Sequence, residues 1–247
     1  MADIGKNTVQ ERTVWGLGAT LGWVILALVL SQIIGTGVLI LLRPDALTGG
    51  MDALMKDGVV VALSNIPANA VQVIILALAA LRPGWAFTEY LGLVRPATRD
   101  VVTALWILVM FLLGSDALTY LLGNDVVSPF QVDTYRSAQS AGMLPLYFFA
   151  LVIAAPVAEE IMFRGFLFRG WVASGRMAIL SILIISALFA AIHIQYDWFG
   201  ILQVFFIGLM LGLVRWRSGS TTLTILMHML ANLWATVETM IKLEWLS

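Results

Sequence analysis

The sequence predicts an all-α protein, a polytopic transmembrane helix bundle of about seven spans (six to eight) in a single domain over residues 1–247. Three observations carry this prediction. Hydrophobic residues make up 60% of the chain, well above their share in a soluble domain. Charged residues make up only 12%, and the mean hydropathy is +0.94. Apolar runs recur along the chain, each with the roughly 18 residues that a helix needs to cross a bilayer.

Seven apolar segments separated by polar turns are the expected spans. The first two end where an arginine precedes a proline, at Arg43-Pro44 and Arg82-Pro83, and proline cannot continue a helix. Between the second and third spans lies GWAFTEYLGLV (84–94), which is too short to cross the bilayer. Its aromatic residues predict a short helix lying at the membrane interface. The expected spans are 15–42, 58–81, 101–122, 144–171, 178–194, 198–214 and 221–237.

The basic residues predict the orientation of the chain. With the N-terminus inside, ten of the 14 Lys and Arg residues lie on the cytoplasmic side and four lie outside. The positive-inside rule favours the orientation with more basic residues on the cytoplasmic side. If Arg164 is placed within the membrane, nine basic residues are still cytoplasmic against four outside. We therefore expect a multi-pass protein of the plasma (inner) membrane with a cytoplasmic N-terminus.

Composition also excludes several function classes. A formal net charge of −1 provides no basic surface for nucleic acid, so we expect no nucleic-acid partner. The absence of cysteine excludes disulfides, thiolate metal ligands and cysteine nucleophiles. The first apolar run is too long for a signal peptide, and no cleavage site follows it. Neither the Gly-x-Ser-Gly of rhomboid-like enzymes nor the Gly-x-Gly-Asp of presenilin-type enzymes is present.

The stretch PVAEEIMFRG (156–165) places two glutamates and an arginine in the fourth span. An ionisable residue at bilayer depth is expensive, and it indicates a functional site by default. Glu160 and Arg164 are four residues apart in the order that favours an ion pair on one helix face. Glu159 lies about 100° from Glu160 and about 140° from Arg164 around the helix, so it cannot share that pair without strain. A carboxylate without a partner on its own helix is typical of a general base.

The two histidines of the chain both lie in later spans. His193 ends the fifth span, and His228 lies in the seventh, four residues before Asn232. Because His228 and Asn232 share one helix face, both side chains can point at one spot. An imidazole and an amide directed together are suitable donors to a developing oxyanion. We expect Glu159 to find its partners in these two histidines.

Three other residues in the spans are interpreted as substrate-binding, packing or interhelical hydrogen-bonding residues. Phe163 and Phe189 are candidates for lining a groove that takes a hydrophobic substrate, although packing is the more frequent duty of such side chains. Asp116 in the third span is interpreted as an interhelical hydrogen-bonding residue or a carboxylate near the surface.

The polar residues of the later spans resemble the three motifs of the CAAX protease and bacteriocin-processing family (CPBP, Abi-type), a family of intramembrane glutamic endopeptidases. These motifs are Glu-Glu-x-x-x-Arg, Phe-x-x-x-His and His-x-x-x-Asn. Here they read EEIMFR (159–164), FAAIH (189–193) and HMLAN (228–232), in order and on three apolar segments. The resemblance covers about residues 145–235, the expected catalytic core.

The resemblance implies a role for each matching residue. Glu159, helped by His193, would activate a water that attacks the carbonyl of a peptide bond. His228 and Asn232 would stabilise the oxyanion. Supporting roles would fall to Glu160 and Arg164, and no metal or other cofactor would be needed.

The resemblance also implies the class of substrate. Family members include proteases that remove the last three residues of prenylated CAAX proteins, and bacterial relatives are linked to peptide processing and bacteriocin immunity. We therefore expect a membrane-associated protein or peptide as substrate, prenylated or not, with the lipid bilayer as its surroundings. The family does not define the substrate further.

Three other readings of the sequence stay open. Two histidines and a glutamate are ordinary zinc ligands, so a zinc-dependent intramembrane protease is an alternative, although HExxH is absent. A non-catalytic membrane scaffold or bacteriocin-immunity protein is a second alternative, but it gives Glu159 no evident use. Asn65, Pro67 and Asn69 form a polar, kinked centre in the second span, as in transporters. The lack of any internal repeat weighs against a transporter.

Overall fold

The computed structural model describes residues 13–82, 84–172 and 176–246. Within these ranges every regular element is a helix, and the expectation of an all-α bundle is confirmed. Lys6, Arg12 and Pro83, which entered the sequence predictions, lie outside the described residues.

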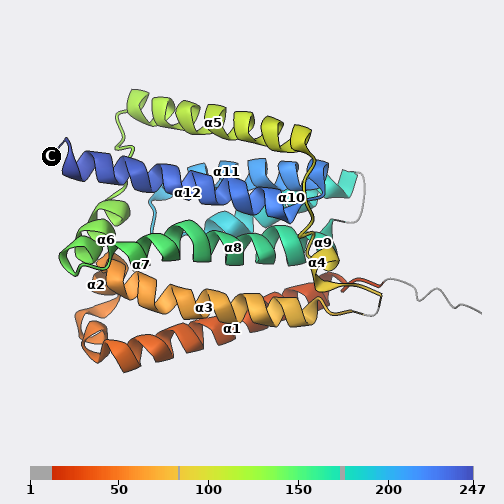
Figure 1. Cartoon of the computed structure of the whole chain (residues 1–247), viewed down its shortest axis with the longest axis horizontal. Coiled ribbons are helices and arrows are strands. Elements are labelled where there is room, and N and C mark those ends of the chain that lie inside the picture. Colours follow the sequence, from red (N-terminus) through yellow and green to blue (C-terminus); the bar gives the residue numbers. More distant parts are fainter. Residues whose placement is uncertain (1–12, 83, 173–175, 247) are drawn as a thin grey trace, which may run out of the picture.

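Helical segments stand at all seven positions where spans are expected, and they run back and forth along one axis (Figure 1). The fourth is a composite helix over Leu144–Trp171, and it lies between α3 and α12. α5 lies at the edge of the bundle against α12 and α11, and α1 lies at the opposite edge against α3. The other six segments are α1 (Leu17–Leu42), α3 (Gly58–Ala79), α5 (Thr98–Leu121), α10 (Arg176–Ala191), α11 (Trp198–Ser218) and α12 (Thr221–Glu244).

Five of these helices are long and apolar enough to cross a membrane, namely α1, α3, α5, the composite fourth helix and α11. α10 is apolar but has only 16 residues. α12 has 24 residues, and its polar side chains, which include His228 and Asn232, lower its hydropathy. The protein is therefore an integral membrane protein. The two helices that fall short are the two that bring histidines to the predicted site.

The composite fourth helix alternates between α-helical and π-helical turns. Two π-helical stretches flank α8, the short α-helix that carries both glutamates of the predicted site. A π-helical turn contains an extra residue, and such turns are frequent at functional sites. The five parts in order are α7 (Leu144–Phe148), η2 (Phe149–Ala154), α8 (Ala155–Glu160), η3 (Ile161–Leu167) and α9 (Phe168–Trp171).

Pro156 explains how the first π-helical stretch is joined to α12. At the end of η2 the backbone bonds reach back five residues, and the N–H of Ala155 donates to the carbonyl of Ala150. Pro156 has no N–H to donate to Leu151, the next carbonyl in that series. The amide of Asn232 on α12 donates to this carbonyl instead, at 2.8 Å. A backbone acceptor left over by a proline thus becomes a contact between two helices.

Short helices cover both ends of the bundle. At one end lie η1 (Pro44–Gly49), α2 (Gly50–Lys56) and α6 (Pro129–Ser140) (Figure 1). α6 begins with a capping box formed by Ser128 and Gln131, and it packs against α3 and α12. From the middle of α6, the hydroxyl of Tyr135 donates a hydrogen bond to Glu244, the last residue of α12. α6 is therefore joined to a helix of the predicted site.

The short helix expected over 84–94 is present but shorter than predicted, and only its C-terminal end is buried. Only α4 (Phe87–Tyr90) is helical, and both Tyr90 and Leu91 have 0% exposure. The ring of Tyr90 packs against Phe166 of η3 with 5.7 Å between centroids. Gly92 follows with a φ of +68°, which turns the chain toward α5. Tyr90 therefore enters the core, while Phe87 at the start of α4 stays 42% exposed.

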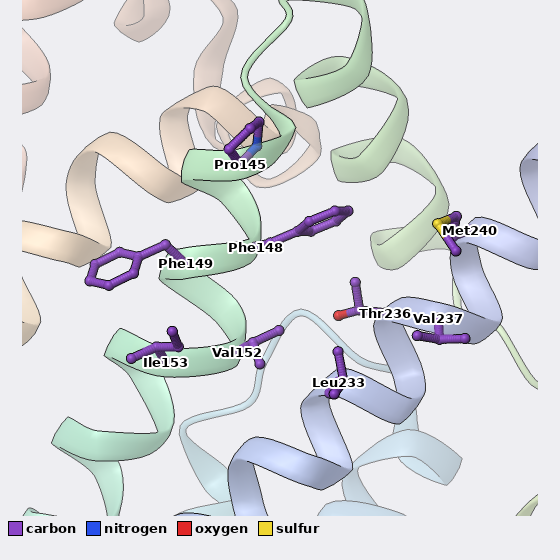
Figure 2. Close-up of a pocket in the computed structure, with 9 residues that line it drawn as sticks. All are labelled: Pro145, Phe148, Phe149, Val152, Ile153, Leu233, Thr236, Val237 and Met240. Carbon is purple, nitrogen blue, oxygen red and sulfur yellow. The ribbon is translucent and has the colours of Figure 1, made fainter.

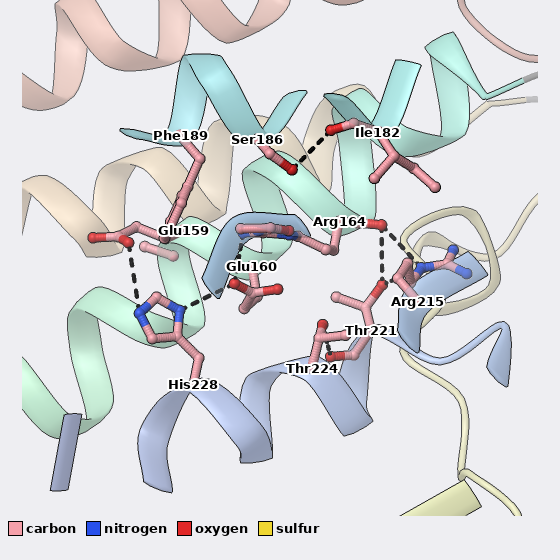
Figure 3. Close-up of polar contacts among 12 residues, drawn as sticks. Glu159, Glu160, Arg164, Ile182, Ser186, Phe189, Arg215, Thr221, Thr224 and His228 are labelled. Carbon is pink, nitrogen blue, oxygen red and sulfur yellow. Dashed lines mark hydrogen bonds and ion pairs between the residues drawn. The ribbon is translucent and has the colours of Figure 1, made fainter. Parts of the chain in front are cut away.

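Arg215 joins this segment to the fourth helix. Its side chain is 5% exposed, and its Nε donates both to the carbonyl of Arg164 and to Oγ1 of Thr221, each at 2.9 Å. The Thr221 hydroxyl in turn donates to the carbonyl of Leu91 at 2.6 Å. Figure 3 shows Arg164, Arg215 and Thr221 together. Arg215 and Arg164 are thus structural cations rather than loop residues. If these two arginines are left out of the orientation count, eight basic residues are expected on the cytoplasmic side and four outside.

We predict that Gly92→Ala destabilises the protein more than Gly123→Ala does. Both glycines have a positive φ, where any other residue costs about 1–2 kcal/mol. A Cβ at Gly92 would lie 2.4 Å from Nη2 of Arg215, whereas a Cβ at Gly123 would meet nothing within 4 Å. Thermal unfolding followed by tryptophan fluorescence measures the difference, and equal losses would show that the Arg215 contact contributes nothing.

Candidate active site

The structure brings the predicted site residues together from three chain segments (Figure 3). Glu159 and Glu160 lie on α8, and Arg164 lies one turn later on η3. His228 lies on α12, where it points back toward the two glutamates. His193 lies two residues beyond Ala191, the last residue of α10, and not within a helix as expected.

Glu160 is fully buried, and it accepts two hydrogen bonds on one oxygen. Nη1 of Arg164 lies 2.8 Å from its Oε1, and the two side chains are 0% and 1% exposed. Nδ1 of His228 lies 3.0 Å from the same oxygen. The ion pair on one helix face is present as the spacing predicts, while the bond from His228 was not predicted. Glu160 is therefore held by its own helix and by α12.

The buried guanidinium of Arg164 contacts three groups from different parts of the fold, although its Nε makes no hydrogen bond to any described residue. Besides Glu160, it donates from Nη2 to the carbonyl of Gly208 on α11 at 2.9 Å. The ring of Phe189 on α10 lies 4.4 Å from its guanidinium carbon, within the range of a cation–π contact. Arg164 therefore contacts α8, α10 and α11, and it contributes to the packing of the whole site.

Glu159 has different surroundings from its neighbour. Its side chain is 21% exposed, and its Oε2 lies 3.9 Å from Nε2 of His193 and 3.9 Å from Nε2 of His228. These distances exceed the 2.7–3.2 Å of an ordinary N–H···O hydrogen bond. Oε2 is buried and makes no hydrogen bond to any residue that the structure describes. The Glu159 carboxylate thus faces both imidazoles while staying free to bind another molecule.

The hydrogen bonds of the two histidines define their tautomers. Nδ1 of His193 lies 2.7 Å from the carbonyl oxygen of Phe189, which can only accept, so this nitrogen carries the hydrogen. Nδ1 of His228 faces Glu160, which is paired with an arginine and also accepts. In the neutral form of each ring Nε2 is therefore an acceptor directed toward Glu159. Oε2 of Glu159 and the Nε2 atoms of both histidines are therefore three acceptors that face one another. They favour binding of a molecule that donates hydrogen bonds.

Asn232 lies four residues after His228 on the same face of α12, but one of its amide hydrogens is already used. Its Nδ2 donates to the carbonyl of Leu151 on η2 at 2.8 Å. An amide nitrogen carries two hydrogens, so one is left for another acceptor. The contact with Leu151 also holds the orientation of the amide.

Phe163 and Phe189 do not line an open groove, and that expectation is wrong. They are 3% and 1% exposed, and their rings pack edge to face with 5.2 Å between centroids. The ring of Phe189 also packs against His193 and His228, at 4.8 Å and 5.7 Å between centroids. The spacing of four residues places Phe189 on the same inward face as the imidazole of His193. These rings support the site from inside the core.

One residue that contacts the site, Gln72, was not assigned to it from the sequence. Nε2 of Gln72 on α3 donates to the carbonyl of Ala158, directly before Glu159, at 3.0 Å. A buried amide in an apolar span was the available signal. Asp116 accepts a hydrogen bond from the indole of Trp234 on α12 at 3.1 Å, so it forms the interhelical contact that the sequence indicates. Over the described ranges, no group of three or more acidic or histidine side chains has the geometry of a metal site.

We predict that Arg164→Met lowers the free energy of unfolding by about 3–5 kcal/mol, because it leaves the carboxylate of Glu160 buried without its charge partner. Equilibrium unfolding in mixed micelles measures the loss. The control is Lys56→Met, which removes a solvent-exposed pair with Asp52, also four residues apart, and should change stability little. The double variant Glu160→Gln/Arg164→Met should recover part of the loss, and a double variant as unstable as the sum of both singles would contradict the coupling.

Comparisons with known proteins bear on the segment that holds the site. The family model described as type II CAAX prenyl endopeptidase Rce1-like matches residues 141–234, which include all seven residues that the three motifs specify. The chain is 31% identical over 133 residues to an uncharacterized 24.3 kDa protein of Escherichia coli, covering 50% of this chain and 61% of that relative. No solved structure matches. Residues 141–234 are therefore similar to this family, in agreement with the resemblance of the three motifs.

Proposed function

We propose that this protein is an intramembrane endopeptidase that hydrolyses a peptide bond of a membrane-associated protein or peptide, of the CAAX or peptide-processing type. The observation that carries the proposal is the contrast between two adjacent carboxylates. Glu160 is fully buried and accepts bonds from Arg164 and His228. Glu159 is partly exposed and lies 3.9 Å from Nε2 of each histidine without a direct bond.

The first step that this geometry supports is the activation of water. Oε2 of Glu159 and the neutral Nε2 of His193 are both acceptors, so a water molecule can donate one hydrogen to each. Its oxygen lone pair is then free to attack the carbonyl carbon of the peptide bond. Glu159 takes the proton as the new carbon–oxygen bond forms, which is general base catalysis.

The second step is stabilisation of the oxyanion and departure of the amine. Asn232 has one amide hydrogen left for the oxyanion, and His228 supplies a second donor at Nε2 once its ring is protonated. The carboxylate of Glu160, 3.0 Å from Nδ1, favours that positive charge. When the carbon–nitrogen bond breaks, the proton held by Glu159 passes to the leaving amine. The oxyanion returns to a carbonyl, and the products are a carboxylic acid, which then ionises, and a free amine.

An apolar groove beside the site suits a hydrophobic part of the substrate. It runs between α7–η2 and α12 and has a volume of about 400 Å³ (Figure 2). Its lining includes Val152 and Leu233, which directly follow the hydrogen-bonded pair Leu151 and Asn232 in the sequence. The single hydroxyl in its wall, that of Thr236, is already bonded to the carbonyl of Asn232. We propose that the groove takes the place assigned earlier to Phe163 and Phe189. Its lining is Pro145, Phe148, Phe149, Val152, Ile153, Leu233, Thr236, Val237 and Met240.

The membrane and the orientation are part of the same proposal. The inner excess of eight basic residues over four, counted without the two buried arginines, supports a cytoplasmic N-terminus in a plasma (inner) membrane. The substrate then approaches from the cytoplasmic side or laterally through the lipid.

We predict that Glu159→Gln lowers kcat at least about 100-fold, since general base catalysis commonly contributes that much. Membrane peptide fractions from cells with the wild type and with Glu159→Gln are compared first, and a precursor that accumulates with the variant identifies the substrate. Purified protein then gives kcat with that precursor. The control is Glu238→Gln, another carboxylate on a membrane helix, which should retain activity.

Two results would change this assignment. Identical peptide fractions would favour the scaffold or immunity reading. Activity that a chelator abolishes and zinc restores would favour the zinc-dependent alternative, which uses the same residues.

We predict that Val237→Trp raises KM for an apolar substrate several-fold and leaves kcat nearly unchanged, because the indole fills the groove without touching Glu159. The matched control is Leu226→Trp, at an exposed apolar position on the same helix outside the groove lining. Steady-state kinetics in nanodiscs measures both variants. An unchanged KM for Val237→Trp would mean that the substrate lies elsewhere.

A further inference from the structure

His193 needs support from outside any helix. It lies in the turn between α10 and α11, two residues after Ala191, so helical backbone bonds do not hold its ring. Its backbone N–H donates to Ala190, and its Nδ1 donates to Phe189, at 3.0 Å and 2.7 Å. These bonds hold one edge of the imidazole. A tilt of the ring about this edge would move Nε2 relative to Glu159.

Tyr196 supplies a contact to the face of this ring. The turn closes with a hydrogen bond of 3.2 Å from the N–H of Tyr196 to the carbonyl of His193, which brings the two side chains together. Their rings are stacked with 6.3 Å between centroids and only 8° between planes. Such a distance is within the range of favourable aromatic pairs. The imidazole of His193 is thus packed against Tyr196 as well as Phe189.

Tyr196 is itself held in place by α6. The ring of Phe130, near the start of α6, packs edge to face on Tyr196 with 5.8 Å between centroids and 82° between planes. Phe130 follows Pro129 in the first turn of a helix that begins with a capping box. A continuous row of rings, Phe130, Tyr196 and His193, therefore connects α6 to the site.

The ring of Tyr196, rather than its hydroxyl, makes these contacts. Burial raises the pKa of Tyr196 above its ordinary value, and the nearby Tyr147 and the negative charge of Glu159 raise it further. The hydroxyl therefore stays neutral, and no hydrogen bond joins it to any residue in the described part of the chain. Its contacts with His193 and Phe130 are ring contacts.

We propose that Tyr196 is a positioning residue whose ring holds the imidazole of His193 with Nε2 facing Glu159. The proposal rests on the proposed function, because it assigns Tyr196 to the same water-activating pair. A displacement of the order of 1 Å at a reacting group can cost about 100-fold in rate. Loss of the ring should therefore act on the chemical step and not on substrate binding.

The kinetic test compares two substitutions at this position. Tyr196→Leu removes the ring and should lower kcat about 10- to 100-fold with KM nearly unchanged, whereas Tyr196→Phe keeps the ring and should retain kcat within about twofold. The matched control is Trp198→Leu, which removes an aromatic ring two residues away that is 75% exposed. Full activity of Tyr196→Leu, or equal losses for Tyr196→Leu and Tyr196→Phe, would overturn the proposal.

A second measurement does not depend on activity. The chain contains only two histidines, so isotope labelling of histidine gives two imidazole spin systems, and His228→Gln identifies which belongs to His193. Tyr196→Leu should shift the carbon-bound ring protons of His193 by removing the ring current, while Tyr196→Phe and Trp198→Leu should not. Unshifted signals in Tyr196→Leu would show that the rings do not stack. This result would stand even if Glu159→Gln proved active and the proposed function failed.

Discussion

The site depends on how the buried charge of Glu160 is neutralised. A carboxylate with no exposed surface must be paired and hydrogen-bonded, and here Arg164 provides the charge while His228 provides a second donor. Arg164 also binds the carbonyl of Gly208, so the same pair holds α11 against the fourth helix. His228 is oriented in the process, and its Nε2 faces Glu159. One buried ion pair thus stabilises the bundle and leaves the adjacent carboxylate available for chemistry.

The fourth helix is the element on which the other helices meet. Its two π-helical stretches and Pro156 disturb the regular backbone ladder, and side chains from neighbouring helices bind its carbonyl groups. Asn232 binds Leu151, Gln72 binds Ala158 and Arg215 binds Arg164, each at 2.8–3.0 Å. Gln72 belongs to the N-terminal half, outside the segment that matches the family. This half therefore supports the site directly, in addition to enclosing it.

Local patterns predicted most of the fold. Apolar runs and the pairing of Glu160 with Arg164 depend on residues close in sequence, and both are present. The bond from His228 to Glu160 and the burial of Arg215 depend on tertiary packing, so no local pattern reports them. For Phe163 and Phe189 the residue type allowed either a groove or packing, and only the tertiary structure shows that both rings are buried. The short α10 ends before His193, and the ring of Tyr196 supports the histidine in the turn that follows.

The two adjacent carboxylates, Glu159 and Glu160, have separate duties. The most direct test measures single-turnover hydrolysis and unfolding temperature on the same preparations of Glu159→Gln and Glu160→Gln. The account predicts that Glu159→Gln loses hydrolysis and keeps the unfolding temperature of the wild type, since its carboxylate makes no hydrogen bond to any described residue. Glu160→Gln should instead unfold at a clearly lower temperature, because Arg164 loses its buried partner. Normal hydrolysis by Glu159→Gln, or parallel losses in both variants, would contradict the claim.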